Sequence, residues 1–423
     1  MKKVTEFLKS ILIVLLTLAV IVLVVLSLPT KTLTAAPRLA AVLRPFAGVL
    51  GISEAELTDT VPAAETQITA AAQPVAVSVN APAGRRSFLY DFAALDSAYE
   101  QLGHLLGQAL DSAENGSITD KNSLQTALSG QSVWLAYPGT IPATALGAWL
   151  HTAAPADAAH CFVLSLEREQ VALYLAGEKV IRYETAADAA EFSEALARYT
   201  PDGSRFAFEE SSAVYAGLDP FCLLPGALPK LTAATMGNPC DSRFVSALAT
   251  ALGFNPYGDA RYVDDAGNTT FTEPGCSLTV TAAGDVQLRT AGDSRFRCAD
   301  DSCTGQIEAA RALLDTVAGN SFGAARLYLT DYDKTETGAV CRFDYCLAGL
   351  PVSAASGHAA AVTVENGAIV SLQLSVRRYA FAGDAVSLLP AAQAAAIASE
   401  GASLHLVYTE GGDGTLTPTW AAE

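Results

Sequence analysis

One short motif has the spacing of a hydrolase nucleophile elbow. Gly319-Asn320-Ser321-Phe322-Gly323 matches G-x-S-x-G, a turn that presents a reactive serine when a strand precedes it and a helix follows. In this chain a helical pattern precedes the motif and a strand pattern follows from Arg326, so the required order is reversed. Gly319 is typical of a helix C-cap. We therefore predict a helix end and a turn here, and no catalytic residue.

The histidines and acidic loops do not have the spacing of a metal site. His160 and Cys161 are neighbours entering a strand, where successive side chains diverge, so we do not expect them to form a Cys–His nucleophile pair. The acidic loops near residues 300 and 331 do not complete a D-x-D-x-D-G calcium loop, and the chain has no glycine-rich phosphate cradle. We expect no bound metal and no cofactor. The five histidines are His104, His151, His160, His358 and His405.

Eight cysteines are an even number, as expected in a compartment that permits disulfides. The spacing of Cys298 to Cys303, and of Cys341 to Cys346, is too long for a zinc knuckle. On a strand, Cys341 and Cys346 would face opposite sides. Two readings stay open for the first pair: a disulfide between Cys298 and Cys303, or buried free thiols. The cysteines are Cys161, Cys222, Cys240, Cys276, Cys298, Cys303, Cys341 and Cys346.

The N-terminus has the composition of a membrane anchor. No charged residue lies between Lys9 and Lys31, and residues 10–30 would span about 31 Å as a helix, the thickness of a bilayer core. This run is longer than the apolar region of a cleaved signal peptide, although Thr34-Ala35-Ala36 could serve as a cleavage site. The lysines before it predict a cytoplasmic N-terminus. We expect a cytoplasmic tail at 1–9, a transmembrane helix at 10–30 and an extracellular remainder.

The rest of the chain divides into a tether and a globular part. Residues 31–84 carry scattered prolines and small polar residues without a sustained period, which predicts a tether. Two domains are expected after it, at 85–235 and 236–423, at the usual domain size. The net charge of −18 argues against nucleic acid as a partner.

The fold class follows from hairpins mixed with single helices. Residues 362–365 and 368–376 alternate apolar and polar side chains around Asn366-Gly367, a type I′ turn signal. Residues 306–317 and 94–110 have apolar positions at helical spacing. Because no strict strand–helix–strand alternation appears, we predict an α+β protein with antiparallel sheets and packed helices.

Several short segments of the chain form a recognisable series. They are 343–352 with its "G-hydrophobic-P-V" step, 362–370 with "V-x-V-x-N-G-x-I", 378–379, 388–395, 404–408, 252–256, 261–262 and 265–267. In these segments the chain resembles the YycH/YycI family, the membrane-anchored accessory proteins of the WalK/WalR cell-wall two-component system. The length is similar to that of the larger, YycH-like member, and the last domain resembles YycI.

The resemblance implies a regulator without catalytic activity, located in the cell membrane. Its partners would be a WalK-like sensor histidine kinase and a second, YycI-like protein. A second class of function is an extracytoplasmic module that binds cell-wall fragments or peptides, and a third is a wall hydrolase. Within the anchor, Ser10, Thr17 and Ala19 are the small residues among bulky aliphatics where a partner helix could approach closely.

Overall fold

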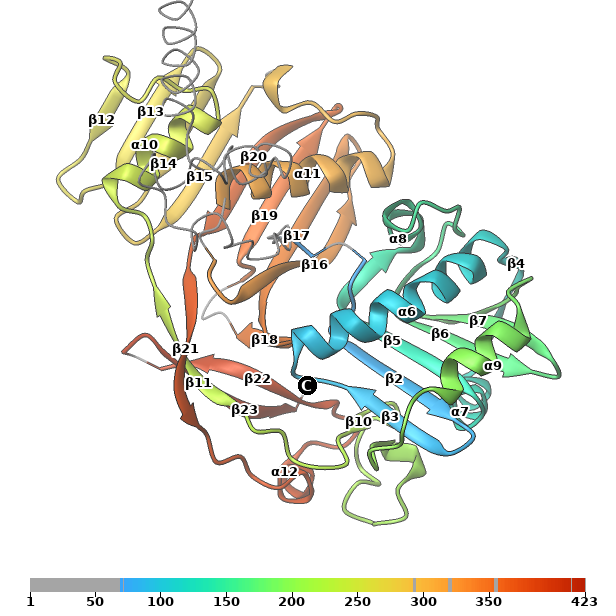
Figure 1. Ribbon diagram of the computed structural model, residues 1–423. Coiled ribbons are helices and arrows are strands. Elements are labelled where there is room, and N and C mark those ends of the chain that lie inside the picture. Colours follow the sequence, from blue (N-terminus) through green and yellow to red (C-terminus); the bar gives the residue numbers. More distant parts are fainter. Residues whose placement is uncertain are drawn as a thin grey trace, which may run out of the picture. The chain divides into compact units, whose positions relative to one another are not determined.

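The computed structural model describes residues 69–70, 72–291, 294–318, 322–353, 357–411 and 413–422. All of them belong to one compact unit, Gln67–Glu423. This described part contains seven α-helices and sheets that are almost entirely antiparallel (Figure 1). The predicted α+β class is confirmed for it.

A seven-stranded antiparallel sheet is built from the first part of the unit, in the order β3-β2-β5-β6-β7-β8-β4. Its central strands are buried on both faces, so they consist of long apolar runs rather than alternating ones. The strands are β2 (Ala76–Ala81), β3 (Gly84–Phe88), β4 (Glu114–Thr119), β5 (Ser132–Pro142), β6 (Ala158–Glu167), β7 (Gln170–Ala176) and β8 (Val180–Glu184).

Helices cover both faces of this sheet. Helices α6 (Phe92–Asp111) and α9 (Ala189–Ala197) pack on one face, where Leu102 and Leu106 are fully buried. Helix α7 (Lys121–Ser129) and Phe206 cover the other. Aspartates begin all three helices, because their carboxylates accept the first free backbone N–H groups. The short α8 (Ala143–Trp149) follows Pro142.

The second part repeats one unit twice: a helix followed by four antiparallel strands. Helix α10 precedes β12 to β15, and α11 precedes β16, β17, β19 and β20. The two sets join through their last strands, where Leu288 of β15 faces Leu372 of β20. The elements are α10 (Ser242–Ala251), β12 (Arg261–Val263), β13 (Thr269–Glu273), β14 (Cys276–Val280), β15 (Asp285–Thr290), α11 (Cys303–Ala318), β16 (Ala325–Lys334), β17 (Gly338–Leu347), β19 (Ala360–Glu365) and β20 (Ala368–Ser375).

Further strands continue this sheet through β18, in the order β18-β22-β23-β11-β21. At the other side, β1 pairs in parallel with β16 and covers its edge. The remaining elements are β1 (Thr69–Ala70), β9 (Arg205–Phe206), β10 (Leu223–Leu224), β11 (Thr232–Gly237), β18 (Leu350–Ser353), β21 (Arg378–Ala385), α12 (Ala391–Ile397), β22 (Leu404–Glu410), β23 (Thr415–Ala422), and two 3-10 turns, η2 (Ala207–Glu209) and η3 (Ser294–Phe296).

Two predicted boundaries differ from the structure. Strands β1 and β2 lie inside residues 31–84, the predicted tether, so folded structure begins before residue 85. Val77, Ser78 and Val79 are all fully buried, and a strand buried on both faces shows no alternation to detect. The predicted domain boundary at 235/236 falls within β11, whose strand pairs with β21 and β23.

Candidate binding site

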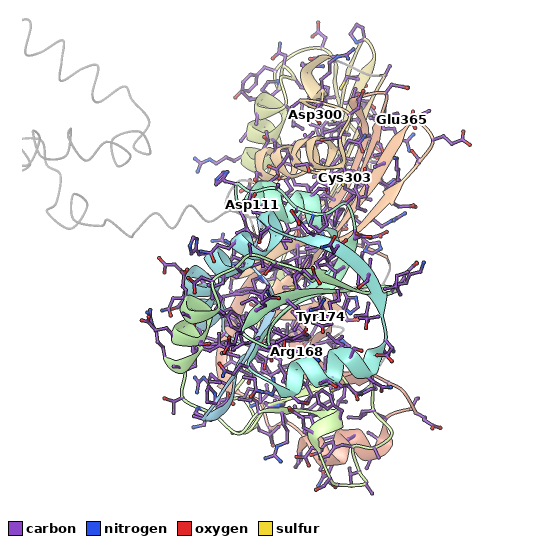
Figure 2. All side chains as sticks on the ribbon, turned by 90° about the vertical axis from the view of Figure 1, so that its right-hand side faces the viewer. Asp111, Arg168, Tyr174, Asp300, Cys303 and Glu365 are labelled. Carbon is purple, nitrogen blue, oxygen red and sulfur yellow. The ribbon has the colours of Figure 1, made fainter. Side chains whose placement is uncertain are left out.

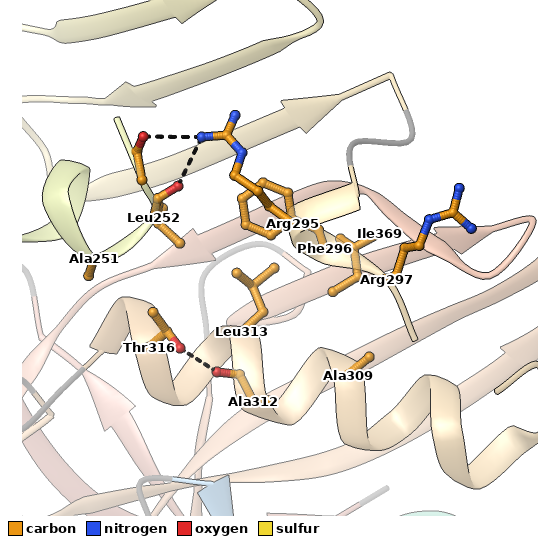
Figure 3. Close-up of a pocket in the computed structure, with 11 residues that line it drawn as sticks. Ala251, Leu252, Arg295, Phe296, Arg297, Ala309, Ala312, Leu313, Thr316 and Ile369 are labelled. Carbon is orange, nitrogen blue, oxygen red and sulfur yellow. Dashed lines mark hydrogen bonds between the residues drawn. The ribbon is translucent and has the colours of Figure 1, made fainter. Parts of the chain in front are cut away.

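A pocket of about 410 Å³ lies between α11, the end of α10 and the segment that follows β15 (Figure 3). Its volume is at the lower end of the range for small-ligand pockets. The lining is apolar apart from two arginines, a threonine and backbone groups. It consists of Ala251, Leu252, Gly253, Arg295, Phe296, Arg297, Ala309, Ala312, Leu313, Thr316 and Ile369.

Helix α11 forms the floor of this pocket. Ala309, Ala312, Leu313 and Thr316 are spaced by three and four residues, so they share one face of the helix. The opposite face, which includes Leu314, is buried in the core. Because two of the four floor residues are alanines, the surface above α11 is hollow rather than filled.

The end of α10 and Arg295 form one wall. The Arg295 Nη1 atom lies 3.2 Å from the carbonyl oxygen of Gly253 and 3.5 Å from that of Leu252. A cation is favourable there because the last carbonyls of a helix carry a partial negative charge. Gly253 has φ of +80° and leaves room for the guanidinium, since a Cβ at that position would lie 3.1 Å from Arg295 Nη1.

Further contacts fix the Arg295 side chain. It forms an ion pair with Glu273 at 3.3 Å, and its guanidinium lies 5.4 Å from the ring centre of Phe254 and 5.6 Å from that of Phe296. These are cation–π distances. Arg295 therefore holds the wall in place, and its charge is partly compensated.

Arg297 is the second cation at the rim. Its backbone bridges to Ala368 at the start of β20, and its side chain is exposed. In Figure 3 its guanidinium points away from that of Arg295. Within the described residues, no salt bridge or hydrogen bond joins this side chain to another group. Arg297 can therefore pair with an anion brought by a ligand.

This arrangement is suited to binding rather than to bond-making chemistry. The lining residues include no carboxylate, imidazole or thiol that could exchange a proton. Apolar side chains in the floor can bury an apolar group, and Arg297 can hold a carboxylate beside it.

A second pocket, of about 450 Å³, lies where the start of α6 meets β21 and the β17–β18 turn. Tyr90 in its wall has φ of +63°, a conformation that aromatic residues rarely adopt, and burial raises the pKa of its phenol. Asp91 is occupied in capping α6, through the amides of Ala93 and Ala94. The pocket is lined by Leu89, Tyr90, Asp91, Phe92, Ala93, Pro229, Lys230, Leu231, Ala348 and Phe381.

All eight cysteines are free thiols in the structure, so the disulfide considered between Cys298 and Cys303 is not formed in it. Both are half-buried and pack against the core cluster that contains Cys341. Burial, then the thiols of Cys303 and Cys298, raise the pKa of Cys341 to about 12. Cys303 is the first residue of α11, and both Cys303 and Asp300 are labelled in Figure 2. Cys346 packs with Tyr328 on the other side of β17, as the strand period predicts.

A contact between a histidine and an aspartate, His358 and Asp344, was not evident from the sequence. His358 Nδ1 lies 2.7 Å from Asp344 Oδ2, and Thr330 Oγ1 donates to the same oxygen at 2.8 Å. The amide of Ala359 donates to Asp344 Oδ1 at 2.8 Å. Asp344 thus anchors the segment after residue 356 to the sheet. Residues 330, 344 and 358 are brought together only by strand pairing, which no local motif indicates.

The other predicted residues lie outside the described part of the chain. This applies to Ser321 of the G-x-S-x-G motif and to Ser10, Thr17 and Ala19 of the anchor. Among the described helices, none has the length and apolar content that crossing a bilayer requires. Nor does any group of three or more His, Cys, Asp and Glu side chains in the described ranges have the arrangement of a metal site.

Comparison with models of protein families, with curated proteins and with solved structures gives no match. The function proposed below therefore depends on the sequence features and on the geometry of this chain.

Proposed function

We propose that this chain is a membrane-anchored, non-catalytic regulator of a sensor histidine kinase that controls cell-wall metabolism. The observation that carries the proposal is the arginine-rimmed apolar pocket on α11, which offers a binding surface and no proton-exchanging group. The short YycH-like segments and the apolar run at 10–30 support it. The kinase lies in the same membrane, and its equilibrium between two signalling states shifts when this chain binds one state more tightly.

The pocket accepts an apolar side chain of the kinase or of a second, YycI-like protein, with a carboxylate next to Arg297. Leu313 and Phe296 supply the buried apolar contact, because both are less than a tenth exposed and line the pocket. A buried apolar anchor surrounded by polar groups is the usual centre of binding energy in protein interfaces.

Co-purification of the kinase with the full chain from membranes tests the proposal. A WalK-like sensor histidine kinase, produced together with the chain, is the probe. Ala312→Trp fills the pocket, and Ala247→Trp on α10 places the same side chain on another exposed helix position that lies outside the lining. We expect Ala312→Trp to reduce recovery of the kinase about tenfold, the effect of losing roughly 1.4 kcal/mol of binding. Equal recovery with both variants would refute a role for the pocket.

A charge reversal gives a second, independent arm. Arg297→Glu removes the rim cation, and Arg243→Glu makes the same change at an exposed position of α10. We expect weaker recovery only for Arg297→Glu, with a loss that shrinks at high salt because exposed charges are screened. Loss of recovery in both variants would instead indicate a general effect of net charge.

The anchor makes its own contribution in this proposal. Helices in lipid associate through close packing at small residues, so Thr17 and Ala19 are the places for a kinase helix to approach. Replacing residues 11–28 by poly-Leu, or introducing Thr17→Leu with Ala19→Leu, is expected to preserve insertion and weaken co-purification. If both variants recover the kinase normally, the anchor is passive and the contact lies outside the membrane.

The second candidate is a module that binds wall-derived peptides. The same pocket favours it, since an apolar floor beside Arg297 fits a short peptide that ends in a carboxylate. Titration of the full chain in detergent with such a peptide, and with its amidated form, distinguishes the two. Binding that requires the free carboxylate and is lost in Ala312→Trp would favour the peptide module.

A further inference from the structure

The edge strand β12 is open to solvent on both faces. Arg261, Tyr262 and Val263 are all exposed, with Tyr262 at 65% and Val263 at 49%. Tyr257, in the loop that leads from α10 to β12, is 87% exposed. Large apolar and aromatic side chains are unusual on an edge strand, because edges are normally protected by lysine, proline or a covering segment.

The two helix-and-four-strand sets form one run of eight strands, in the order β12-β13-β14-β15-β20-β19-β17-β16. The two end strands of this run, β16 and β12, differ in whether another strand covers them. At one end β16 is covered, since Thr69 and Ala70 of β1 pair with it. At the other end, within the described residues, β12 pairs with β13 and with no further strand. The open edge is therefore at β12.

The hydrogen bonds around β12 show which backbone groups face outward. The amide of Thr272 donates to Ala260 at 3.1 Å, and the amide of Asp264 donates to Asn268 at 3.0 Å. In an antiparallel pair the facing residues alternate, so the backbone of Tyr262 is directed to β13 and that of Val263 points away. The Arg261 amide turns back to Gly258 at 3.3 Å. The N–H and C=O of Val263 and the C=O of Arg261 remain for an added strand.

Charge around the edge indicates which strand could be added. Asp259, Asp264 and Asp265 flank the three strand residues. If β12 paired with a second copy of itself in the symmetric register that uses Arg261 and Val263, Asp259 of one copy would face Asp265 of the other. Like charges directly opposite destabilise a strand pair. A basic segment is favoured for the same reason.

We propose that β12 is a docking edge that binds an extended, basic segment of a partner protein by adding a strand to the sheet. Backbone hydrogen bonds to Val263 and Arg261 hold the segment, Tyr257 and Tyr262 pack against its apolar side chains, and the three aspartates pair with its lysines or arginines. This mode of recognition uses main-chain bonds for affinity and alternate side chains for specificity. The inference deepens the proposed function, because it states how the regulator would contact its partner.

A peptide of alternating lysine and valine is the probe, and the same peptide with glutamate in place of lysine is its control. Binding to the full chain in detergent is followed by fluorescence anisotropy. We expect the lysine peptide to bind and the glutamate peptide not to bind. Val263→Pro removes the outward N–H without removing a bond to β13, since proline is tolerated on an edge where its nitrogen faces solvent.

Val263→Thr keeps the N–H and a branched side chain, so it is the matched variant. We expect Val263→Pro to weaken the lysine peptide about three- to tenfold, the effect of one lost hydrogen bond, and Val263→Thr to leave binding unchanged. Asp259→Asn with Asp265→Asn should weaken binding and reduce its dependence on salt.

Three results would overturn the proposal: no binding of the lysine peptide, equal binding of both peptides, or equal affinity of the proline and threonine variants. Circular dichroism of each variant shows whether the sheet is intact. A failure here is separable from a failure of the proposed function. The peptide assay measures binding at β12 alone, whereas Ala312→Trp and Arg297→Glu change the pocket and leave β12 as it is.

Discussion

The ion pair between Arg85 and Glu209 should be the most sensitive polar contact on the α7 face of the seven-stranded sheet. Arg85 Nη2 lies 2.6 Å from Glu209 Oε1, and Arg85 Nε lies 3.2 Å from Oε2. The arginine side chain is 4% exposed and the glutamate 25%. Arg85 also donates to Ser78 and Leu128, and its guanidinium lies 4.5 Å from the ring centre of Phe206.

Glu209→Gln would leave the buried guanidinium without a counter-charge. Breaking a buried pair from one side costs about 3–5 kcal/mol. Because water reaches a quarter of the Glu209 side chain, we expect a smaller loss, about 2–4 kcal/mol of unfolding free energy. In the double variant Arg85→Met with Glu209→Gln, the uncompensated charge is gone. Its loss of unfolding free energy should therefore be smaller, by at least about 1 kcal/mol, than the sum of the losses in the two single variants.

Guanidinium unfolding of the full chain in detergent measures these differences. Trp134 is a local fluorescence probe, because its ring packs edge-on against Phe206 at 5.5 Å. Glu194→Gln is the control, since its pair with Arg198 is exposed on both sides and should change stability by less than about 0.5 kcal/mol. Equal effects of Glu209→Gln and Glu194→Gln would refute the reasoning.

Three other predictions concern packing, pH and thiols. Gly338→Ala places a Cβ 2.0 Å from the carbonyl oxygen of Val364, so thermal unfolding should show a loss of about 1–3 kcal/mol of unfolding free energy. The control Gly217→Ala, whose Cβ meets no atom within 4 Å, should leave stability unchanged. Equal effects of the two variants would contradict this prediction. Burial raises the pKa of Asp202, but hydrogen bonds from Ser204 and Ser87 outweigh it and the pKa is lowered. Its carboxylate therefore stabilises the fold above the ordinary aspartate pKa of about 3.9, and this stability is lost as the pH falls through the lowered pKa. The Asp202→Asn variant should be less stable than the unsubstituted chain at neutral pH, and its stability should fall less when the pH is lowered. The same acid dependence in both proteins would argue against a stabilising role of the Asp202 carboxylate. Burial raises the pKa of Cys222 to about 11. A thiol reagent at mildly alkaline pH should therefore label the half-buried Cys298 and Cys303 well before Cys222 or Cys341. If mass spectrometry of oxidised protein shows Cys298 joined to Cys303, those two thiols would resist labelling.

Local patterns predicted the elements whose signals are contained within one segment. The period of α11 and the Asn366-Gly367 turn between β19 and β20 are examples. Strand β2 gave no signal because both its faces are buried. Helix α7 and strand β4 were missed, since α7 carries few apolar residues and β4 is exposed along most of its length.

The candidate pocket could not be predicted in the same way. Arg295 and Arg297 lie in a segment between β15 and α11, and only the packing of that segment on α10 places them beside Ala312 and Leu313. Their sequence neighbours do not indicate this arrangement. The open edge at β12 likewise depends on which strands pair elsewhere, because an edge is defined by the absence of a neighbour in the sheet.

The most direct test of the regulatory role is phosphorylation of a WalR-like response regulator by the same WalK-like sensor histidine kinase. The kinase is reconstituted in vesicles with and without the full chain. We predict that the chain changes the extent of phosphorylation about fivefold or more, the lower end of usual allosteric coupling, and that Ala312→Trp diminishes this change while Ala247→Trp does not. Phosphorylation that is the same with and without the folded chain, at matched amounts of kinase, would contradict the account.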